Sequence, residues 1–378
     1  SRRQRQMCIR DRFIEEISVI NFRNHKNFFI NNLKPFVVLN GENGSGKTNI
    51  LEAISLFSPG KGLKNASLRD MPNKYETEKG FQIKIYLKYD AGKIELKKSF
   101  FTNDKKNNLL LSDNEKINQS ELLNFINILW ITPIMEKVML QSNSEKRNFF
   151  DRLIFNLNRS HLKLYSVLQK LLRERLAILQ NTQIDNEWLN TVEAKISNSS
   201  YEIIQNRNQF IVNLNSSLKM IDKPFTTCSI EFRHDISKII STDNKNTFVE
   251  SYKSFLANTR KIDAELNKTS HNISKVSIDI WSNIQDKMEI KNCSTGEQKS
   301  ALLSIFISVA KLIKEQNDGR SPILLIDEAT AHLDQNHRDF LFEELKKLNS
   351  QVWFTGVSKN LFENISDQTV FHEIENNI

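Results

Sequence analysis

Apolar and polar residues alternate along the first third of the chain, which predicts antiparallel β-strands with one wet face. The clearest run covers residues 81–89, where every second position is apolar. Asp90-Ala91-Gly92 supplies a turn and the alternation resumes at Ile94, so this segment predicts a β-hairpin. Further short strands are predicted at residues 17–20, 28–30, 109–111 and 128–131.

From about residue 145 the apolar period changes to that of a helix, and it persists to residue 179. A second helical run covers residues 188–218, after a polar stretch at 181–186. The two runs predict an antiparallel helical pair, and its length exceeds an ordinary layer, so we expect a protruding arm. Residues 222–292 give weaker signals, with candidate strands at 226–232 and 276–280.

A phosphate-binding loop is predicted between an apolar strand at residues 36–39 and a helix at 49–54. The eight residues between them match G-x-x-x-x-G-K-[ST] at every fixed position: Gly41, Glu42, Asn43, Gly44, Ser45, Gly46, Lys47 and Thr48. Backbone amides of the loop, together with Asn49 at the start of the helix, are expected to hold the phosphates of a nucleoside triphosphate. Lys47 would meet the β and γ phosphates, and Thr48 would offer its hydroxyl to Mg²⁺.

A wholly apolar strand at residues 323–326 ends in Asp327 and Glu328, the acidic pair that such a loop requires. Asp327 is expected to hold Mg²⁺ through its water shell, and Glu328 to orient or deprotonate the attacking water. The candidate metal residues are therefore Thr48 and Asp327, and the candidate catalytic residues are Glu328 and Lys47.

The two halves of this site are far apart in sequence, since 280 positions separate Lys47 from Asp327. A long insertion therefore interrupts the ATPase core, and the helical arm is its expected content. Before the second half, a small turn opens an apolar helix at 301–313 and could hold a further γ-phosphate. That turn consists of Ser294, Thr295, Gly296, Glu297, Gln298 and Lys299. Serine and glycine before a helix are more often a simple cap.

Asp334 follows the acidic pair, ahead of a predicted helix and a further parallel strand at 352–356. His332, two positions earlier, is a further catalytic candidate, although capping or packing histidines are more frequent.

The net charge of +8 is unevenly distributed. Half of it lies in Ser1–Arg12, which holds five arginines and one aspartate and which we interpret as a non-native or disordered basic segment. The remaining charge is a weak argument for a polyanionic partner. Three scattered cysteines, Cys8, Cys228 and Cys293, indicate neither a disulfide framework nor a zinc site. With no apolar run of bilayer length, we expect a cytoplasmic protein without a membrane partner.

Taken together, seven short blocks resemble the ATP-binding-cassette head of the SMC-like family. The blocks are residues 21–24, 41–54, 58–63, 130–133, 146–153, 293–302 and 324–334. The resemblance implies an α/β P-loop ATPase head with an antiparallel β subdomain over residues 13–135 and 275–378. It implies a largely helical inserted arm domain over residues 136–274. The family's usual Gly-Pro-His-Arg motif is reduced to His271, and residues 355–358 lack the histidine of transporter cassettes.

The resemblance also implies that ATP and Mg²⁺ are bound by a homodimer. Residues 294–299 of one copy would complete the loop at 41–48 of the other, with Asp334 among the nucleotide-binding residues. The implied activity is a weak, DNA-stimulated ATPase that binds double-stranded and gapped DNA. It would cooperate with the mediators RecO and RecR in loading RecA recombinase. The candidate DNA-contacting residues are Lys61, Lys64, Arg69, Lys146 and Arg147, although ordinary solvent-facing basic residues explain most of these positions equally well.

Two other ATPase classes share these motifs. An energising subunit of a membrane transporter is disfavoured by the long separation, the arm and the missing switch histidine. The head of a structural chromosome protein would carry a coiled coil of hundreds of residues, whereas each helical run here is short. A nuclease is disfavoured because the sequence shows no His and Asp metal cluster.

Overall fold

The computed structural model describes residues 13–89, 92–102, 106–183, 185–238, 240, 244–284, 288–328, 333–356 and 358–375. The interpretation of Ser1–Arg12, the turn residues Asp90 and Ala91, and His332 all lie outside the described residues. The chain forms two compact units. The first comprises residues 1–137, 220–226 and 295–378, and the second comprises residues 138–219 and 227–294.

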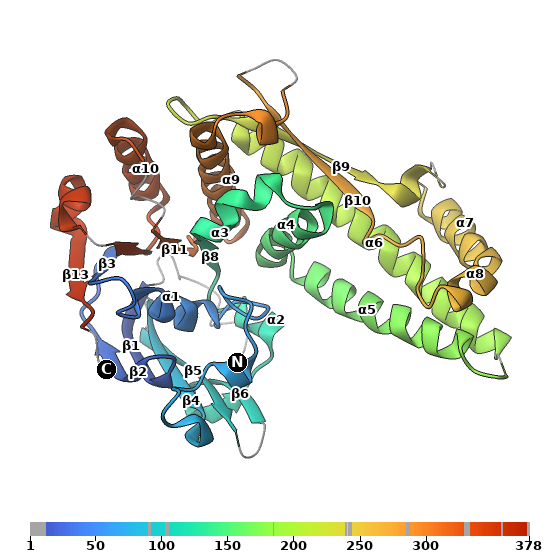
Figure 1. Cartoon of the computed structure of the whole chain (residues 1–378), viewed down its shortest axis with the longest axis horizontal. Helices are drawn as coiled ribbons and strands as arrows, with labels where there is room; N and C mark the ends of the chain where they lie inside the picture. Colours follow the sequence, from blue (N-terminus) through green and yellow to red (C-terminus); the bar gives the residue numbers. More distant parts are fainter. Residues whose placement is uncertain are drawn as a thin grey trace. The chain divides into compact units, whose positions relative to one another are not determined.

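A five-stranded, fully parallel sheet forms the centre of the first unit (Figure 1). Its strands, in spatial order, are β13 (Thr369–Glu373), β3 (Phe36–Asn40), β12 (Val352–Gly356), β11 (Ile323–Asp327) and β8 (Ile128–Ile131). Four of these strands, β3, β12, β11 and β8, are buried along their whole length and are mostly apolar, because both faces of the sheet are covered. The strands predicted at 128–131, 323–326 and 352–356 are confirmed.

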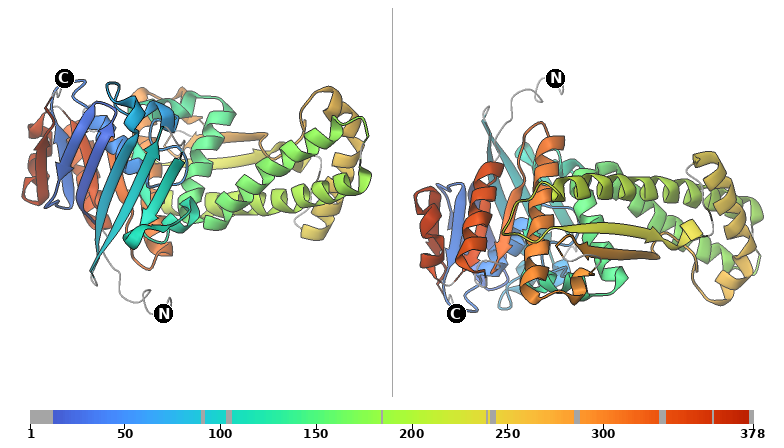
Figure 2. Two further views of the ribbon diagram at one scale, coloured as in Figure 1. Left: turned by 90° about the horizontal axis from the view of Figure 1, so that it is seen from below. Right: turned by 90° about the horizontal axis from the view of Figure 1, so that it is seen from above.

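A six-stranded antiparallel sheet forms the second layer of this unit (Figure 2). Successive side chains of a strand point to opposite faces, and only one face of this sheet is buried. Every second residue is therefore apolar, as along β4. The predicted hairpin pairs β4 with β5. The strands, in spatial order, are β2 (His25–Ile30), β1 (Phe13–Phe22), β4 (Phe81–Tyr89), β5 (Gly92–Phe101), β6 (Lys106–Leu111) and β7 (Glu115–Lys116).

Helix α1 (Lys47–Ser55) lies between the two sheets, and its apolar side chains join both of them in one core (Figure 1). The opposite face of the parallel sheet is covered by α9 (Thr295–Gln316) and α10 (Gln335–Leu348). Two short helices, α2 (Gln119–Leu122) and α3 (Pro133–Glu136), flank β8 in sequence. The two sheets therefore hold α1, whose first two residues are the last two of the phosphate loop, from both sides.

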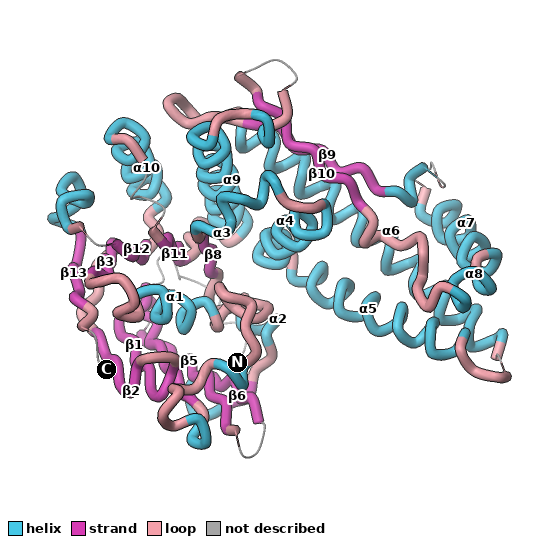
Figure 3. The backbone as a smooth tube through the Cα atoms, viewed as in Figure 1, coloured by secondary structure: helices cyan, strands magenta, loops and turns pink. Residues whose placement is uncertain are grey.

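The second unit is built on α5 (Arg159–Leu179) and α6 (Asn186–Leu218), which run antiparallel as predicted (Figure 3). One prediction is corrected, because the first helical run breaks at Asn158. This residue adopts an extended φ of −126° and its side chain caps α5, so α4 (Asn143–Leu157) is a separate helix. The unit also contains β9 (Cys228–His234), β10 (Val276–Ser282), α7 (Lys245–Asn258) and α8 (Arg260–Glu265).

Two buried arginines join the helices of the second unit. Arg175 on α5 binds Glu193 on α6 at 3.0 Å and Asp263 on α8 at 2.8 Å. Arg207 on α6 binds both carboxylate oxygens of Asp151 on α4. Removing one partner of such a buried pair would leave an uncompensated charge, so these contacts specify how the helices pack.

The observed units differ from the predicted lobes in three segments, of which the shortest is residues 136–137, which belong to the first unit. Residues 275–294 belong to the second unit because β10 pairs with β9 along its whole length. Residues 220–226 belong to the first unit, where Thr226 bonds to α9. No helix in the described part of the chain is long and apolar enough to cross a membrane.

Lys98 on β5 provides a test of the core between the two sheets. Its side chain is 2% exposed, opposite Ile83 and Leu109, and its ammonium has no acidic partner among the described residues. Burial lowers its pKa from 10.5 to about 8, so the folded state binds fewer protons than the unfolded state between these pH values. Stability should therefore rise as the pH increases from about 8 towards 10.5.

We expect Lys98→Met to raise the free energy of unfolding by about 2 kcal/mol at pH 7 and to lose this advantage near pH 10.5. Urea denaturation at both pH values measures the change. Lys97→Met is the matched control, because Lys97 is the neighbouring residue on the other face of β5. Equal effects of the two substitutions at pH 7 would contradict the assignment.

Candidate functional site

The phosphate loop requires glycine at two positions for steric reasons. Gly41 has a φ of +150°, and a Cβ there would lie 2.5 Å from the carbonyl oxygen of Ile374. Gly46 has a φ of +104°, and a Cβ would lie within 2.6 Å of Asn24 and His25. The backbone can make these close approaches only without side chains. Gly46 is also the N-cap of α1. The backbone N–H groups in the first turn of that helix, which have no acceptor within the helix, therefore face the space that a phosphate would occupy.

Lys47 extends back over its own loop. Its Nζ donates hydrogen bonds to the carbonyl oxygens of Gly41 and Glu42, each at 2.7 Å. Burial lowers the pKa of Lys47, while the nearby Glu328 and Asp327 act in the opposite direction. The ammonium is therefore held at the loop and faces both acids predicted to complete the site.

Asp327 joins the two predicted half-sites. Its Oδ1 accepts a hydrogen bond from Thr48 Oγ1 at 2.8 Å and another from Thr355 Oγ1 at 2.7 Å. Asp327 is buried at the carboxyl end of β11, and Thr48 lies in the first turn of α1. A hydroxyl and a carboxylate side by side are hard oxygen donors, and such donors suit Mg²⁺.

Glu328 has an unusual backbone conformation. Its φ is +52°, in the left-handed region that residues other than glycine seldom adopt. The backbone N–H of Glu328 donates to Thr355 Oγ1 at 3.0 Å, which fixes this turn. The side chain is exposed and lines the cavity above the phosphate loop. Such local strain is typical of residues positioned for function.

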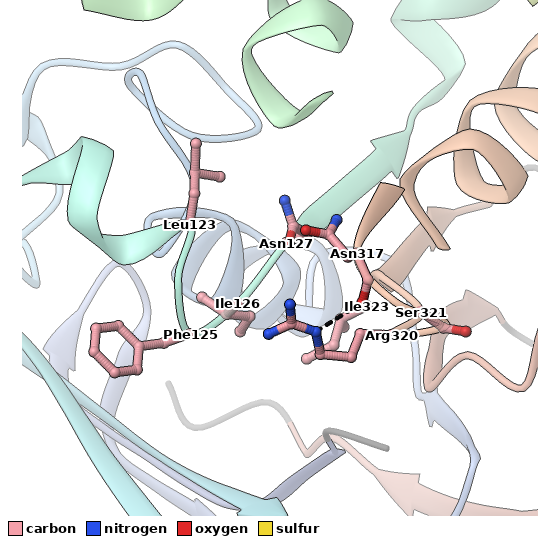
Figure 4. Close-up of a pocket in the computed structure, with 8 residues that line it drawn as sticks. All are labelled: Leu123, Phe125, Ile126, Asn127, Asn317, Arg320, Ser321 and Ile323. Carbon is pink, nitrogen blue, oxygen red and sulfur yellow. Dashed lines mark hydrogen bonds between the residues drawn. The ribbon is translucent and has the colours of Figure 1, made fainter. Parts of the chain in front are cut away.

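A cavity of about 580 Å³ lies over the loop, a size suited to a nucleotide-sized ligand. Its lining includes Asn43, Gly44, Gly46, Lys47, Thr48, Asn49, Lys64, Glu328, Gly356, Ser358 and Leu361. A second cavity, near Arg320 and Asn317, has a volume of about 10 Å³ and could hold at most one water (Figure 4). The larger cavity is therefore the candidate nucleotide site.

The turn between β1 and β2 holds the phosphate loop in place, a role that our motif analysis missed. Asn24 Nδ2 donates to the carbonyl oxygen of Ser45 at 2.9 Å, and its Oδ1 accepts from Asn49 Nδ2 at 2.7 Å. His25 Nε2 lies 3.1 Å from the carbonyl oxygen of Gly46. Residues 21–24 contribute to the family resemblance, but their pattern alone does not predict these contacts.

Arg23, in the same turn, binds α1 directly. Its guanidinium reaches both carboxylate oxygens of Glu52, at 2.5 and 2.9 Å, and Glu52 is fully buried. Lys64 lies 3.6 Å from the same carboxylate and donates to Asn49 Oδ1. A bidentate pair to a buried acid fixes both distance and orientation, so the phosphate-loop helix is anchored to the antiparallel sheet.

The turn predicted to meet a γ-phosphate, residues 294–299, lies at the start of α9, and we call it the signature. Ser294, Thr295 and Gly296 are exposed, and Glu297 is half-buried. Gln298 and Lys299 are buried, and Lys299 forms an ion pair with Glu136 at 2.9 Å. Within the described first unit, residues 295–299 do not line the cavity over the phosphate loop of their own chain.

Asp334 caps α10. Its Oδ1 accepts a hydrogen bond from the backbone N–H of His337, which lowers the pKa of the carboxyl group. Like residues 295–299, it does not line the described cavity. Within the first unit, the structure therefore assembles residues 41–49, 327 and 328 in one place, and residues 295–299 and Asp334 lie outside the lining of the described cavity.

The five candidate DNA-contacting residues differ in their surroundings. Arg147 Nη1 donates to the carbonyl oxygen of Ser274, and Lys146 Nζ to that of Ile278, so both contribute to packing in the second unit. Lys64 belongs to the phosphate-loop network. Lys61 and Arg69 are exposed.

Comparison with known proteins gives a consistent picture. Residues 13–377 match the model of the RecF/RecN/SMC N terminal domain. The chain is similar to the DNA replication and repair protein RecF of Rickettsia felis, with 32% identity over 361 residues, covering 94% of this chain and 96% of that protein. It is 33% identical to RecF of Rickettsia prowazekii over 362 residues, with 94% and 97% coverage.

Solved structures show the same fold. The structure of the recombination mediator protein RecF-ATP in the RecFOR pathway has a TM-score of 0.83 at 21% identity, covering 97% of this chain and 98% of that one. An Smc head domain from Pyrococcus furiosus, bound to the C-terminal domain of ScpA, has a TM-score of 0.51 at 15% identity, covering 97% and 95%.

Thr355 tests the geometry of the acidic pair, because its hydroxyl bonds to both Asp327 and the backbone of Glu328. We expect Thr355→Val to lower the turnover of ATP about 10-fold or more, since two hydrogen bonds to this pair are lost. Steady-state phosphate release measures kcat. Thr355→Ser keeps the hydroxyl and should retain most of the activity. A fully active Thr355→Val variant would show that the hydroxyl has no role in turnover.

Proposed function

Because the chain belongs to the RecF family of DNA replication and repair proteins, we propose that it is an ATP-gated, DNA-binding ATPase of recombinational repair. The observation that carries the proposal is the hydrogen bond between Thr48 and Asp327, which joins a complete phosphate loop to its acidic partner. ATP occupies the cavity over the loop, and its hydrolysis acts as a timer for binding rather than as a step in DNA cleavage.

Residues 41–49 hold the phosphates through backbone amides, and Lys47 exchanges its carbonyl partners for the β and γ phosphates. Mg²⁺ would be held by Thr48 and by Asp327 through its water shell, and it would neutralise charge on the phosphates. Asp327 and Thr48 already lie within hydrogen-bond distance, so little rearrangement is needed.

Glu328 is the residue we assign to the attacking water. Its carboxylate lines the cavity together with Lys47, while its backbone is fixed by Thr355. A carboxylate in this position accepts a hydrogen bond from water and turns its lone pair towards the γ-phosphate. Asp327 remains bonded to the two threonine hydroxyls, so the two acids have separate roles.

A second copy of the chain would close the site. Ser294, Thr295 and Gly296 are exposed at the start of α9, and the N-terminus of a helix suits the negative charge of a γ-phosphate. Gly296 has open space where a Cβ would project, so another backbone or a phosphate can approach closely. Since residues 295–299 do not line their own chain's described cavity, we propose that they meet the nucleotide of the partner copy. Nucleotide state then determines dimer state.

The biological partners follow from the family. We propose that the dimer binds double-stranded and gapped DNA and acts in the cytoplasm with RecO and RecR to load RecA. The support is the similarity to RecF proteins over most of the chain and the RecFOR description of the matching structure. Turnover is proposed to be slow and stimulated by DNA, because hydrolysis serves to release the clamp.

Glu328→Gln tests the coupling between ATP and assembly. This variant should bind ATP, fail to hydrolyse it and accumulate as a dimer, because the neutral amide cannot accept a proton from water. Light scattering after size exclusion measures the mass with and without ATP. Glu363→Gln, at an exposed position on the first unit, is the matched control. A Glu328→Gln variant that stays monomeric at saturating ATP and high protein concentration would refute the two-copy site.

DNA dependence is tested by phosphate release with and without duplex DNA, on protein lacking Ser1–Arg12. We expect duplex DNA to raise the rate at low salt, and the stimulation to fall steeply as salt increases, since binding releases counterions from the phosphates. Removing the first twelve residues ensures that their five arginines do not supply the response. No stimulation at any salt concentration would rule out a DNA-dependent ATPase.

A further inference from the structure

The first turn of α10 contains an interaction that ordinary helix capping does not require. Asp334 Oδ1 accepts from the backbone N–H of His337 at 2.9 Å, which is the usual cap. Its second oxygen, Oδ2, lies 2.7 Å from Nδ1 of the same histidine. A carboxylate can only accept, so Nδ1 carries the proton. Both oxygens of Asp334 are thus held, although the side chain of Asp334 is 64% exposed.

The imidazole of His337 is itself held from its other side. Its ring stacks on Phe225, with the ring centres 5.8 Å apart and the planes inclined by 21°. Phe225 is buried and also contacts Phe340 edge-on at 5.0 Å. A cap alone would be satisfied by any residue other than proline at position 337, because it uses only the backbone N–H. The stack and the second hydrogen bond need the histidine ring.

Thr226, the residue after Phe225, is hydrogen-bonded to α9. The backbone N–H of Thr226 donates to Ser300 Oγ at 2.7 Å, and its carbonyl oxygen accepts from Ser304 Oγ at 2.8 Å. Both serines are buried on α9, within ten residues of the helix start. A continuous chain of contacts therefore runs from α9 through residues 225–226 and His337 to the Asp334 carboxylate.

We propose that His337 is a positioning residue for ATP-dependent dimerisation, which holds the exposed carboxylate of Asp334 in register with the start of α9. A second copy of the chain then meets the carboxylate and the signature turn as one preorganised surface. This inference rests on the proposed two-copy site. Ordering a charged side chain before association removes an entropic cost that binding would otherwise carry. His337 acts through Asp334 and touches no nucleotide in its own chain.

Two substitutions separate the parts of this arrangement. His337→Phe keeps an aromatic ring against Phe225 and removes the donor to Asp334. His337→Asn removes the ring but places an amide N–H close to the position of Nδ1, so it can restore the hydrogen bond. Gln335→Ala, an exposed position in the same helical turn, is the matched control. The measurements are the dissociation constant of the ATP-bound dimer, the ATP affinity of the dilute monomer, and the thermal unfolding midpoint.

We expect His337→Phe to weaken the ATP-bound dimer by roughly 10- to 100-fold, because a symmetric dimer contains the interaction twice. ATP affinity of the monomer and the unfolding midpoint should match those of the control. His337→Asn should recover most of the lost dimer affinity, which a role in packing alone would not produce.

Three results would overturn the inference. In the first, wild type dimerises with ATP and His337→Phe does so equally well, which leaves the proposed function standing. In the second, His337→Asn loses as much affinity as His337→Phe, which assigns the effect to the ring rather than to Asp334. In the third, wild type itself does not dimerise with ATP, and the proposed two-copy site then fails together with this inference.

Discussion

The nucleotide site depends on one row of residues across the parallel sheet. Leu39 on β3 is in register with Thr355 on β12, and Thr355 with Asp327 on β11. This register brings the end of the strand before the phosphate loop within one strand of the acidic pair. Thr48 and Asp327, 279 positions apart, can then share a hydrogen bond. A change in strand register would separate Thr48 from Asp327. The packing of the first unit therefore has to keep Leu39, Thr355 and Asp327 side by side.

Two kinds of contact fix the position of α1, and with it Thr48, relative to the parallel sheet. Buried aliphatic residues of α1 fill the space between the sheets, which sets the height of the helix. The bidentate contact of Arg23 with Glu52 sets its rotation, and Asn24 holds the loop carbonyl of Ser45. Hydrophobic packing is nondirectional and tolerates small shifts, whereas these polar contacts have fixed lengths and angles. The turn between β1 and β2 of the antiparallel sheet is therefore part of the nucleotide site, whereas the sequence pattern predicted only strands there.

Local patterns in the sequence were sufficient to predict where the phosphate loop and the acidic pair lie in the fold. In both cases an apolar strand is followed directly by a short polar motif. The strand, the turn and the functional side chains are therefore adjacent in sequence. The supporting contacts of Asn24, Arg23 and Thr355 could not be predicted in this way, because each partner lies more than 20 positions away. The pairing of β9 with β10 could not be predicted for the same reason, since about 40 residues separate the two strands in sequence. The break at Asn158 had a local signal, an N-cap residue within an apolar period, that competed with the helical pattern.

Separating the signature from the phosphate loop has a physical consequence. A site completed within one chain would hold its nucleotide at all protein concentrations, and hydrolysis would change little beyond that site. In this chain, residues 295–299 begin a helix whose buried positions are fixed by Glu136 and by the contacts of Thr226, so the exposed turn cannot move independently. Any group that binds the turn meets a rigid element of the first unit. In the proposed two-copy site, loss of the γ-phosphate would act on the whole interface at once, because a packed helix transmits a displacement rather than absorbing it.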